Sequence, residues 1–377
     1  MERREPADVS VLERDLVFMH ICYVADASSV HVHRWASFFL DEGHQVSIIT
    51  DVSGDIPGAE VYNVGDLLPS VRIPGISAGL QIMAKVRHIR RIIRVIQPDI
   101  VHGHYATNYG FLAALSGFQP LFQTVHGSDV LVDASGSWEQ RWFVRYALQK
   151  AVRITVVADH MAERVSAMGI PTERLLVHQY GVDTDRFSPP VESSVRGQYR
   201  IVSTRMFEWK YNVGELVHAA SFVIARVPRA EFVLAGDGTD RDQIEGLVAA
   251  SGVGASISLV GRQSHGDIPD LLRSAAVYVS TSVTDGTSLS LLEAMACGAF
   301  PVVTDIPGNR SWVVDGENGF LFPTGNPEVL SDRIAMALED QDLRANVVAR
   351  NLEMVRTRGE YRSSMKIIEA EYERVLR

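Results

Sequence analysis

Cysteine, basic charge and long apolar runs are all scarce in this sequence. Its 377 residues include only two cysteines, Cys22 and Cys297, each within a mostly apolar stretch. They form no metal-ligand spacing and are typical of buried thiols in a reducing compartment. The 36 Lys and Arg against 46 Asp and Glu give a net charge of −10. This argues against nucleic acid as the main partner, because binding a phosphate backbone needs a basic surplus.

Membrane-spanning and secretory segments are not predicted either. Every apolar segment is interrupted by charges before it reaches the ~18 residues needed to cross a bilayer. The charged start, Met1–Pro6, is not followed directly by an apolar stretch of the kind found in secretory signals. We therefore expect a soluble, cytoplasmic protein, with contact to the inner face of a membrane left open.

What the sequence does contain is the pattern of a two-domain α/β protein. Its 46% hydrophobic and 22% charged residues are ordinary for a globular chain, and its 377 residues exceed what one hydrophobic core usually organises. Short aliphatic runs alternate with helical periodicity, which predicts parallel sheets covered by helices on both faces. The predicted strands are 16–24, 45–50, 99–102, 121–125, 153–157 and 175–179 in the first half, then 200–204, 230–235, 256–260, 276–280 and 300–304.

A helix, a linker and a final helix complete this organisation. Apolar residues three and four apart predict a helix over 31–42, which Gly43 would end. The Pro- and Ser-rich segment 187–194 has no periodicity and is interpreted as a linker. The last segment, 361–376, follows a polar stretch and is helical.

These elements predict two Rossmann-like, doubly wound domains, over 1–187 and 198–358. Two such domains would face a central cleft, with a ligand at the carboxyl ends of the strands. Which ligand binds there depends on the loops.

The loops after the predicted strands disfavour two common classes of nucleotide enzyme. A dinucleotide-binding dehydrogenase needs glycines after its first strand, whereas the turn Ala25–Val30 has none. Asp51, which ends the second strand, is then better explained as a turn residue than as a ribose ligand. Trp209-Lys210 lacks the glycines of a Walker loop, so an ATPase is also disfavoured.

The segment 283–298 carries the most chemistry. It follows a strand and opens a helix, so the amides of Ser288, Leu289 and Ser290 would lie unpaired at the positive end of the helix dipole. That arrangement suits a phosphate, and Glu293, one turn further in, is placed to accept hydrogen bonds from a ribose diol. The alternative is that Ser288 only caps the helix and Glu293 is a solvated acid.

Asp285 and Glu293 are separated by seven residues, and this stretch resembles the E-x7-E signature of the retaining glycosyltransferases of family 4, which have the GT-B fold. The resemblance implies that the first acid, Asp285, is a catalytic residue that contacts the donor sugar and that the second, Glu293, holds the ribose. This chain departs from the signature by having Asp at the first position. The resemblance further implies that the C-terminal helix, 361–377, returns to the N-terminal domain.

The resemblance extends to a pair of cations and covers nearly the full chain. Ser203 to Lys210 resembles the family segment in which an Arg and a Lys five residues later grip the donor diphosphate, and Arg205 and Lys210 match those positions. Two fixed cations would stabilise a leaving diphosphate without a metal. A surface pair beside a loop is the alternative.

In the N-terminal half, Thr124 to Asp129 resembles the family loop whose His lies near the donor sugar, which makes His126 the first catalytic candidate there. The turn at 180–187 resembles the family Asn-Gly-Val-Asp turn, with Tyr180 where Asn is usual. Strand ends on the same face carry the acceptor candidates, which are Asp26, His31 and His104. His33 and His102 are interpreted as structural.

A basic segment, 85–96, has five Lys or Arg interleaved with Ile and Val. It could lie on anionic lipid, as in lipid-using relatives, or be an amphipathic helix packed on its own sheet.

Together these features predict a retaining glycosyltransferase that moves a hexose-type sugar from a nucleotide diphosphate to a glycan, lipid-linked or small-molecule acceptor, in polysaccharide or glycoconjugate synthesis. The N-terminal domain would bind the acceptor and the C-terminal domain the nucleotide sugar, with no metal or other cofactor. A GT-B sugar-nucleotide epimerase and a catalytically silent nucleotide-sugar-binding protein are the alternatives.

Overall fold

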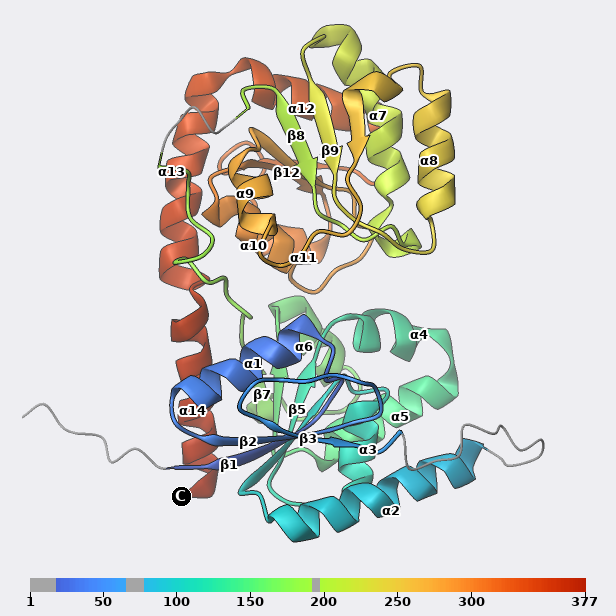
Figure 1. Cartoon of the computed structure of the whole chain (residues 1–377), viewed down its shortest axis with the longest axis vertical. Coiled ribbons are helices and arrows are strands. Elements are labelled where there is room, and N and C mark those ends of the chain that lie inside the picture. The colour runs from blue at the N-terminus through green and yellow to red at the C-terminus, as the bar shows by residue number, and fades with distance from the viewer. Residues whose placement is uncertain (1–17, 66–77, 192–196) are drawn as a thin grey trace, which may run out of the picture.

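The computed structural model describes residues 18–65, 78–191 and 197–377. The charged start, the first two residues of the strand predicted at 16–24, and linker residues 192–194 lie outside these ranges. Within them the chain forms two α/β units, one above the other in Figure 1.

The first unit is built on a seven-stranded parallel sheet with the order β3-β2-β1-β4-β5-β6-β7. Its strands are β1 His20–Val24, β2 Gln45–Thr50, β3 Glu60–Asn63, β4 Ile100–His104, β5 Leu121–Val125, β6 Arg153–Val156 and β7 Leu175–Val177. Its helices are α1 Val30–Asp41, α2 Ala78–Ile96, α3 Tyr109–Ser116, α4 Ala134–Gly136, α5 Trp138–Lys150 and α6 Asp159–Ser166, with a π-helical turn η1 Asp129–Asp133 and a 3₁₀ turn η2 Thr172–Arg174.

The second unit has a six-stranded parallel sheet with the order β10-β9-β8-β11-β12-β13. Its strands are β8 Arg200–Ser203, β9 Glu231–Leu234, β10 Ile257–Leu259, β11 Val277–Ser280, β12 Phe300–Thr304 and β13 Phe320–Phe322. Its helices are α7 Val213–Arg226, α8 Arg241–Ala250, α9 Ile268–Arg273, α10 Leu289–Ala296, α11 Pro307–Arg310, α12 Pro327–Glu339 and α13 Gln341–Arg358, with 3₁₀ turns η4 Trp209–Tyr211 and η5 Gly254–Ser256. The predicted fold class, two Rossmann-like parallel-sheet domains, is confirmed.

Both faces of each sheet are covered, as the buried runs of the sequence predicted. In β1, Ile21 and Tyr23 pack into the core under α1, while Cys22 and Val24 pack into the core under α2 and α3. Successive side chains of a strand point to opposite faces, so a strand buried on both sides reads as a continuous apolar run. Cys297 is likewise buried, in the core beneath α10.

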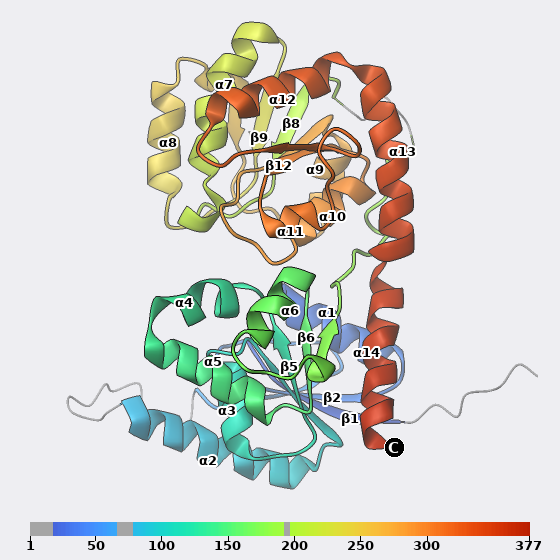
Figure 2. The same ribbon diagram turned by 180° about the vertical axis from the view of Figure 1, so that it is seen from behind.

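The C-terminal helix crosses back to the first unit. α13 and α14 Tyr361–Leu376 form a rod along one side of both units (Figures 1 and 2). Met365, Ile368 and Tyr372 of α14 are buried in the same core as Phe39 and Phe122 of the first unit. The expected return of this helix is therefore confirmed.

The chain passes between the units twice at one place. The Val182 amide donates to the Gly359 carbonyl at 2.7 Å, and the Tyr361 amide donates to the Val182 carbonyl at 3.0 Å. Gly181 has φ +67°, and a Cβ there would lie 2.6 Å from the Tyr361 Cα. Only glycine fits this crossing point.

Candidate active site

A cleft of about 730 Å³ lies between the two units. Its first wall is formed by residues at or after the ends of β1, β4, β5 and β7, and its second wall by residues that follow β8, β10 and β11. Because parallel strands end at one edge of a sheet, both sheets direct their carboxyl-end loops into this space. Every predicted site residue lines it: Asp26, His31, His104, His126, Arg205, Lys210, Asp285, Ser288, Leu289, Ser290 and Glu293.

The second wall is centred on the start of α10. The side chain of Ser288, the N-cap, accepts from the Leu291 amide at 3.3 Å. The amides of Leu289 and Ser290 precede the first hydrogen bond of the helix and have no partner in the described chain. They leave two donors at the positive end of the dipole, facing the cleft.

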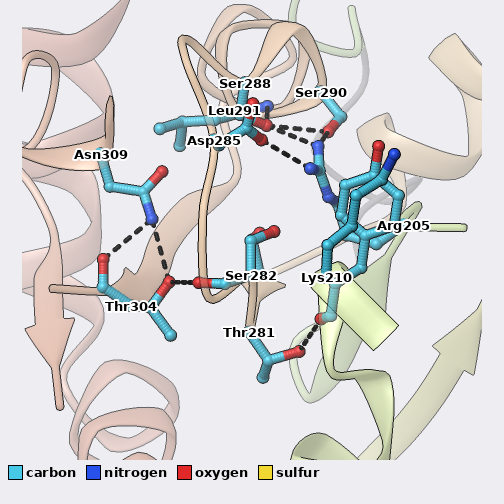
Figure 3. A network of polar contacts seen from close by, with 12 residues as sticks. Arg205, Lys210, Thr281, Ser282, Asp285, Ser288, Ser290, Leu291, Thr304 and Asn309 are labelled. Carbon is cyan, nitrogen blue, oxygen red and sulfur yellow. Dashed lines mark hydrogen bonds and ion pairs between the residues drawn. The ribbon is translucent and has the colours of Figure 1, made fainter. Parts of the chain in front are cut away.

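Arg205, which follows β8, reaches this helix start (Figure 3). Its Nη1 donates to Ser288 Oγ and to Ser290 Oγ, both at 2.8 Å, and its Nη2 donates to Asp285 Oδ2 at 2.6 Å. Ser288 therefore caps the helix and also holds a cation, so the interpretation of this serine as a cap alone is incomplete. The Arg205 guanidinium also stacks on the Tyr211 ring at 4.1 Å.

Arg205 stays a cation although its side chain is only 9% exposed. Burial is the largest influence on its pKa and acts to lower it, but Asp285, Tyr278 and Tyr211 together outweigh burial and raise the pKa. Asp285 was predicted as a catalytic residue and Arg205 as a donor-binding residue, with no contact between them, whereas here they form an ion pair. The sequence gives no signal of this contact, because 80 residues separate the two partners.

Lys210 lies in η4 and is more exposed than Arg205. Its Nζ is 3.1 Å from Glu208 Oε2 and 5.0 Å from the centre of the Tyr211 ring. Burial acts to lower its pKa, yet Tyr211 and Glu208 raise it above its ordinary value. The Lys210 carbonyl accepts from the Val283 amide at 2.9 Å, which ties η4 to the loop after β11.

Glu293 is not a solvated acid, which rules out that alternative. It is 7% exposed, and burial raises its pKa to about 7, against the opposing charges of Arg34, Arg186 and Arg205. Its carboxylate has no hydrogen-bond or ion-pair partner among the described residues. Glu293 also lines a second cavity of about 480 Å³, between α1 and the crossing segment that follows Gly181. An acid this deep and without a partner is available to a ligand.

On the first wall, a buried carboxylate shapes the loop that holds His126. Asp129 accepts the amides of Gly127 and Val130 at Oδ1, at 2.9 and 3.1 Å, and those of Ala106 and His126 at Oδ2, at 2.9 and 3.3 Å. Burial raises its pKa to about 6, and the amide donors act against that rise. Sequence reasoning gave Asp129 no role, because its function is to hold backbone.

His126 stands in a cluster of neutral rings. Its Nε2 is 3.2 Å from His104 Nδ1, and its Nδ1 is 2.9 Å from the Tyr180 hydroxyl. The His31 ring lies 4.7 Å from the Tyr180 ring. Burial lowers the pKa of His31 to about 4 and the pKa values of His104 and His126 well below their ordinary range.

Among the remaining polar residues of the first unit, Asp26 faces the cleft, whereas His33 and His102 contact other groups of the protein. Asp26 lines the cleft and accepts from the amide and hydroxyl of Ser28 at 2.8 and 2.6 Å. His33 contacts the Ala27 carbonyl, and His102 contacts Thr124 and Tyr372. These partners give His33 and His102 structural roles. His104 is only 2% exposed, and it lines the cleft beside His126.

The two walls touch at the loop before α10. Thr287 Oγ1 donates to the Val157 carbonyl of the first unit at 2.9 Å. A Cβ on Gly286 would lie 2.8 Å from Met161 Sδ, and one on Gly127 would lie 3.3 Å from the Gly286 amide. Small residues therefore allow the loop that carries Asp285 to approach the loop that carries His126.

Two negative findings apply to the ranges that the structure describes. No group of three or more His, Cys, Asp or Glu side chains is arranged to hold a metal ion. No helix there combines the length and apolar character needed to cross a bilayer.

Comparison with known proteins identifies relatives of the whole arrangement. The family model "Glycosyl transferases group 1" matches residues 185–354, and "Glycosyl transferase 4-like" matches residues 20–158, so between them they account for most of the chain. A putative glycosyltransferase, EpsD of Bacillus subtilis, is 28% identical over 70% of this chain and 73% of its own length. A phosphatidyl-myo-inositol mannosyltransferase of Mycolicibacterium smegmatis is 25% identical over 92% of this chain and 88% of its own length.

Solved structures agree with this fold. The crystal structure of Anabaena HepE in complex with UDP and glucose has a TM-score of 0.79 at 17% identity, over 94% of this chain and 99% of that one. Sucrose-phosphate synthase of Thermosynechococcus elongatus also has a TM-score of 0.79, at 18% identity, over 95% and 99% of the two chains. At this identity the likeness establishes the fold, GT-B, rather than the substrate.

Proposed function

The chain belongs to the group 1 glycosyl transferases and is a glycosyltransferase of the GT-B fold, and we propose that it transfers a hexose from a nucleoside diphosphate to an acceptor hydroxyl with retention of configuration. The second wall of the cleft binds the nucleotide sugar. The first wall, with Asp26, His31 and His104 as candidates, receives the acceptor.

The observation that carries this proposal is the cation held at the start of α10. Arg205, Lys210 and the free amides of Leu289 and Ser290 converge on one part of the cleft. A diphosphate gains negative charge as its bond to the sugar breaks, so fixed positive groups stabilise the transition state more than the ground state. The protein supplies that charge itself, and the proposal includes no metal or other cofactor.

Glu293 is assigned to the ribose of the donor. Its carboxylate is buried, unpartnered and one turn along α10 from the free amides. An ionised carboxylate can accept two hydrogen bonds from a vicinal diol. The complex of HepE with UDP and glucose supports UDP-hexoses as the first donors to test.

Retention is the finer part of the proposal. Asp285, the carboxylate beside the diphosphate region, is bound by Arg205, which disfavours its attack on the sugar. We assign a front-face route: the acceptor oxygen bonds to the anomeric carbon as the bond to phosphate breaks. The electron pair of that bond stays on the departing phosphate oxygen, which takes the acceptor proton.

For the acceptor, we propose a glycan or a lipid-linked molecule reached at the inner face of the membrane, and the phosphatidyl-myo-inositol mannosyltransferase among the relatives supports the lipid-linked class. α2 offers the matching surface. It packs on the sheet through Val86, Ile89 and Ile93, as the amphipathic-helix alternative predicted, yet Leu80 and Met83 are 54% and 66% exposed. Three of its cations, Arg87, Arg91 and Arg94, are exposed and have no protein partner among the described residues.

Vesicle sedimentation tests this surface. Replacing Arg87, Arg91 and Arg94 by Ser should abolish binding to phosphatidylglycerol vesicles and leave the weak binding to phosphatidylcholine unchanged. The control replaces three exposed arginines of the second unit, Arg229, Arg350 and Arg356, and so changes the net charge equally. Equal loss in both triple variants would remove α2 from the proposal.

Turnover tests the main proposal. The full chain is incubated with UDP- and GDP-hexoses and a panel of octyl glycosides and membrane lipid extract. Released nucleotide is measured, and the anomer of the product is read by NMR. Lys210→Ala and Glu293→Ala should each lower transfer at least tenfold, whereas Arg226→Ala, in an exposed ion pair far from the cleft, should not.

The other possible outcomes of this experiment would each contradict part of the proposal or favour a different function. Wild-type rates in both cleft variants would overturn the donor-site assignment. An epimerised donor, formed without acceptor, would identify an epimerase. Nucleotide binding without any turnover would identify a silent binding protein, and an inverted product would overturn retention.

A further inference from the structure

His126 has no free ring nitrogen in this structure. Its Nδ1 lies 2.9 Å from the Tyr180 hydroxyl and its Nε2 lies 3.2 Å from His104 Nδ1. A neutral imidazole has one donor and one acceptor nitrogen, and which nitrogen carries the proton depends on its partners. The partners of His126 therefore determine whether it can donate to a sugar or only accept from one.

The two possible directions of this hydrogen-bond chain are not equivalent. In the first, Tyr180 donates to His126 Nδ1, and His126 Nε2–H donates to His104 Nδ1. In the second, His104 Nδ1–H donates to His126 Nε2, and His126 Nδ1–H donates to the Tyr180 oxygen. A phenol is a stronger acid than a neutral imidazole N–H, and an imidazole nitrogen is a stronger base than a phenol oxygen, so the first direction makes the better bond at the Tyr180 end.

The number of buried donors and acceptors left without a partner favours the same direction of the hydrogen-bond chain. Tyr180 is 5% exposed, and its hydroxyl has no partner other than His126 in the described chain. The second direction would leave a buried O–H without an acceptor and His104 Nε2 without a donor. The first leaves only one N–H unpaired, at His104 Nε2, which is buried and unpartnered. The rings of Trp35 and Tyr23 lie nearly perpendicular to His104 at 5.0 and 5.3 Å, an arrangement that tolerates an N–H better than a lone pair.

We propose that Tyr180 is the positioning residue of His126: by donating to Nδ1 it fixes the proton on Nε2 and makes His126 a hydrogen-bond donor toward the donor sugar. The role of His126 toward the donor sugar rests on the proposed function. The hydrogen bond from Tyr180 and the proton on His126 Nε2 concern the free protein. On sugar binding, the Nε2–H is exchanged from His104 Nδ1 to a sugar oxygen, and no covalent bond changes.

The backbone around Tyr180 is built to hold this side chain still. The next residue, Gly181, is fixed against Tyr361 at the crossing between the units, and its carbonyl accepts from Arg34 Nη2 at 2.7 Å. The Tyr180 ring also packs against His31 at 4.7 Å and 33°. At this position the resembled family turn usually has Asn. The Asn side chain is shorter than that of Tyr and has no ring to pack beside both histidines.

The tautomer of His126 can be read in the free protein. Long-range ¹H–¹⁵N spectra separate the two neutral tautomers, and a His126→Ala spectrum assigns the signals. Wild type should show the Nε2–H form, and Tyr180→Phe, which keeps the ring and removes the donor, should shift His126 toward the Nδ1–H form. Tyr199→Phe, in the second unit, is the matched control. An Nδ1–H form in the wild type, or identical spectra in Tyr180→Phe, would overturn the proposal.

Kinetics with a UDP-hexose donor test the consequence. Tyr180→Phe should lower kcat about tenfold, the effect of one misdirected hydrogen bond, with KM for the donor changed less than threefold and UDP affinity unchanged. Unchanged kcat would remove the catalytic half of the proposal. If no donor is turned over by the wild type, the proposed function fails, while the spectra still decide the role of Tyr180.

Discussion

The two walls of the cleft differ in electrostatics more than in architecture. Both are the carboxyl-end loops of parallel sheets, yet one presents ionised groups and the other neutral rings. On the second wall, Arg205 and Lys210 have raised pKa values, because neighbouring acids and Tyr211 outweigh the effect of burial. On the first wall, burial lowers the pKa values of His31 and His126 and keeps both rings neutral.

The difference has a local cause in the partners of each group. Each cation of the second wall has a carboxylate within reach, Asp285 at 2.6 Å and Glu208 at 3.1 Å. The rings of the first wall pack on one another, and the buried acid beside them, Asp129, is bound to backbone amides. A diphosphate requires fixed charge, whereas sugar hydroxyls are recognised by neutral donors and acceptors. The contrast therefore matches what each wall is proposed to bind.

Removing Arg205 should produce the largest effect, because it takes the buried cation from the charged second wall and lowers the affinity for UDP. Arg205→Ala deletes the buried cation and its fork of donors, and hydrogen bonds to charged groups contribute about 1.5–3 kcal/mol each. UDP affinity measured by calorimetry should fall at least ~100-fold. Arg205→Lys should recover little of it, because an ammonium cannot reproduce the fork that spans Asp285, Ser288 and Ser290.

Arg226→Ala is the matched control for this loss, since Arg226 forms an exposed ion pair with Glu339 on α12. UDP affinity within twofold of wild type in Arg205→Ala would mean that the diphosphate binds elsewhere. The contrast between the walls would then have no bearing on donor binding.

Glu293→Gln tests separately how the Glu293 carboxylate of the second wall affects the free energy of unfolding and the affinity for the donor. Folding raises the pKa of Glu293 from 4.5 to about 7, mainly through burial. The stabilisation from its neutral form is fully present below pH 4.5 and is lost as the pH rises through 7. Gln is neutral at every pH, so the variant should be more stable than wild type at pH 8, by up to about 3 kcal/mol.

Denaturant unfolding at pH 8 and pH 5 measures this difference, which should shrink at the lower pH. In the same variant, affinity for UDP-glucose should fall about tenfold at pH 8, because the ionised acceptor of the ribose diol is lost. A variant that is less stable than wild type at pH 8 would contradict the assignment of an unpartnered buried acid.

Much of this organisation could be predicted from the sequence, because parallel strands buried on both faces give strong apolar runs. β3 and β13 were missed, and β3 is half-exposed and so lacks a buried apolar run. The strand predicted at 99–102 continues to His104, so His104 ends a buried strand rather than lying in a loop. Strand ends depend on pairing with neighbours, which local sequence does not encode.

The residues of the candidate site were predicted from the sequence, but the contacts between them were not predicted. The Arg205–Asp285 pair and the chain from Tyr180 through His126 to His104 join loops from different strands. Tyr180 was noted only as a departure from a motif, and Asp129 only as part of one. Their importance lies in side-chain direction and burial, which exist only after the sheets have formed.

The smallest expected effect concerns the neutral wall. Because burial lowers the pKa of His31 from 6.5 to about 4, its NMR signals should not move between pH 8 and 5.5 and should titrate near 4. On the same wall, burial raises the pKa of Asp129 to about 6, so the comparison of affinities is confined to pH 8 to 6.5, where Glu293 is the main titrating group of the two. In Glu293→Gln the UDP-glucose affinity should then vary less than twofold from pH 8 to 6.5. A His31 midpoint near 6.5, or a slope that survives in Glu293→Gln, would show that the first wall is charged in solution and would remove the contrast between the walls.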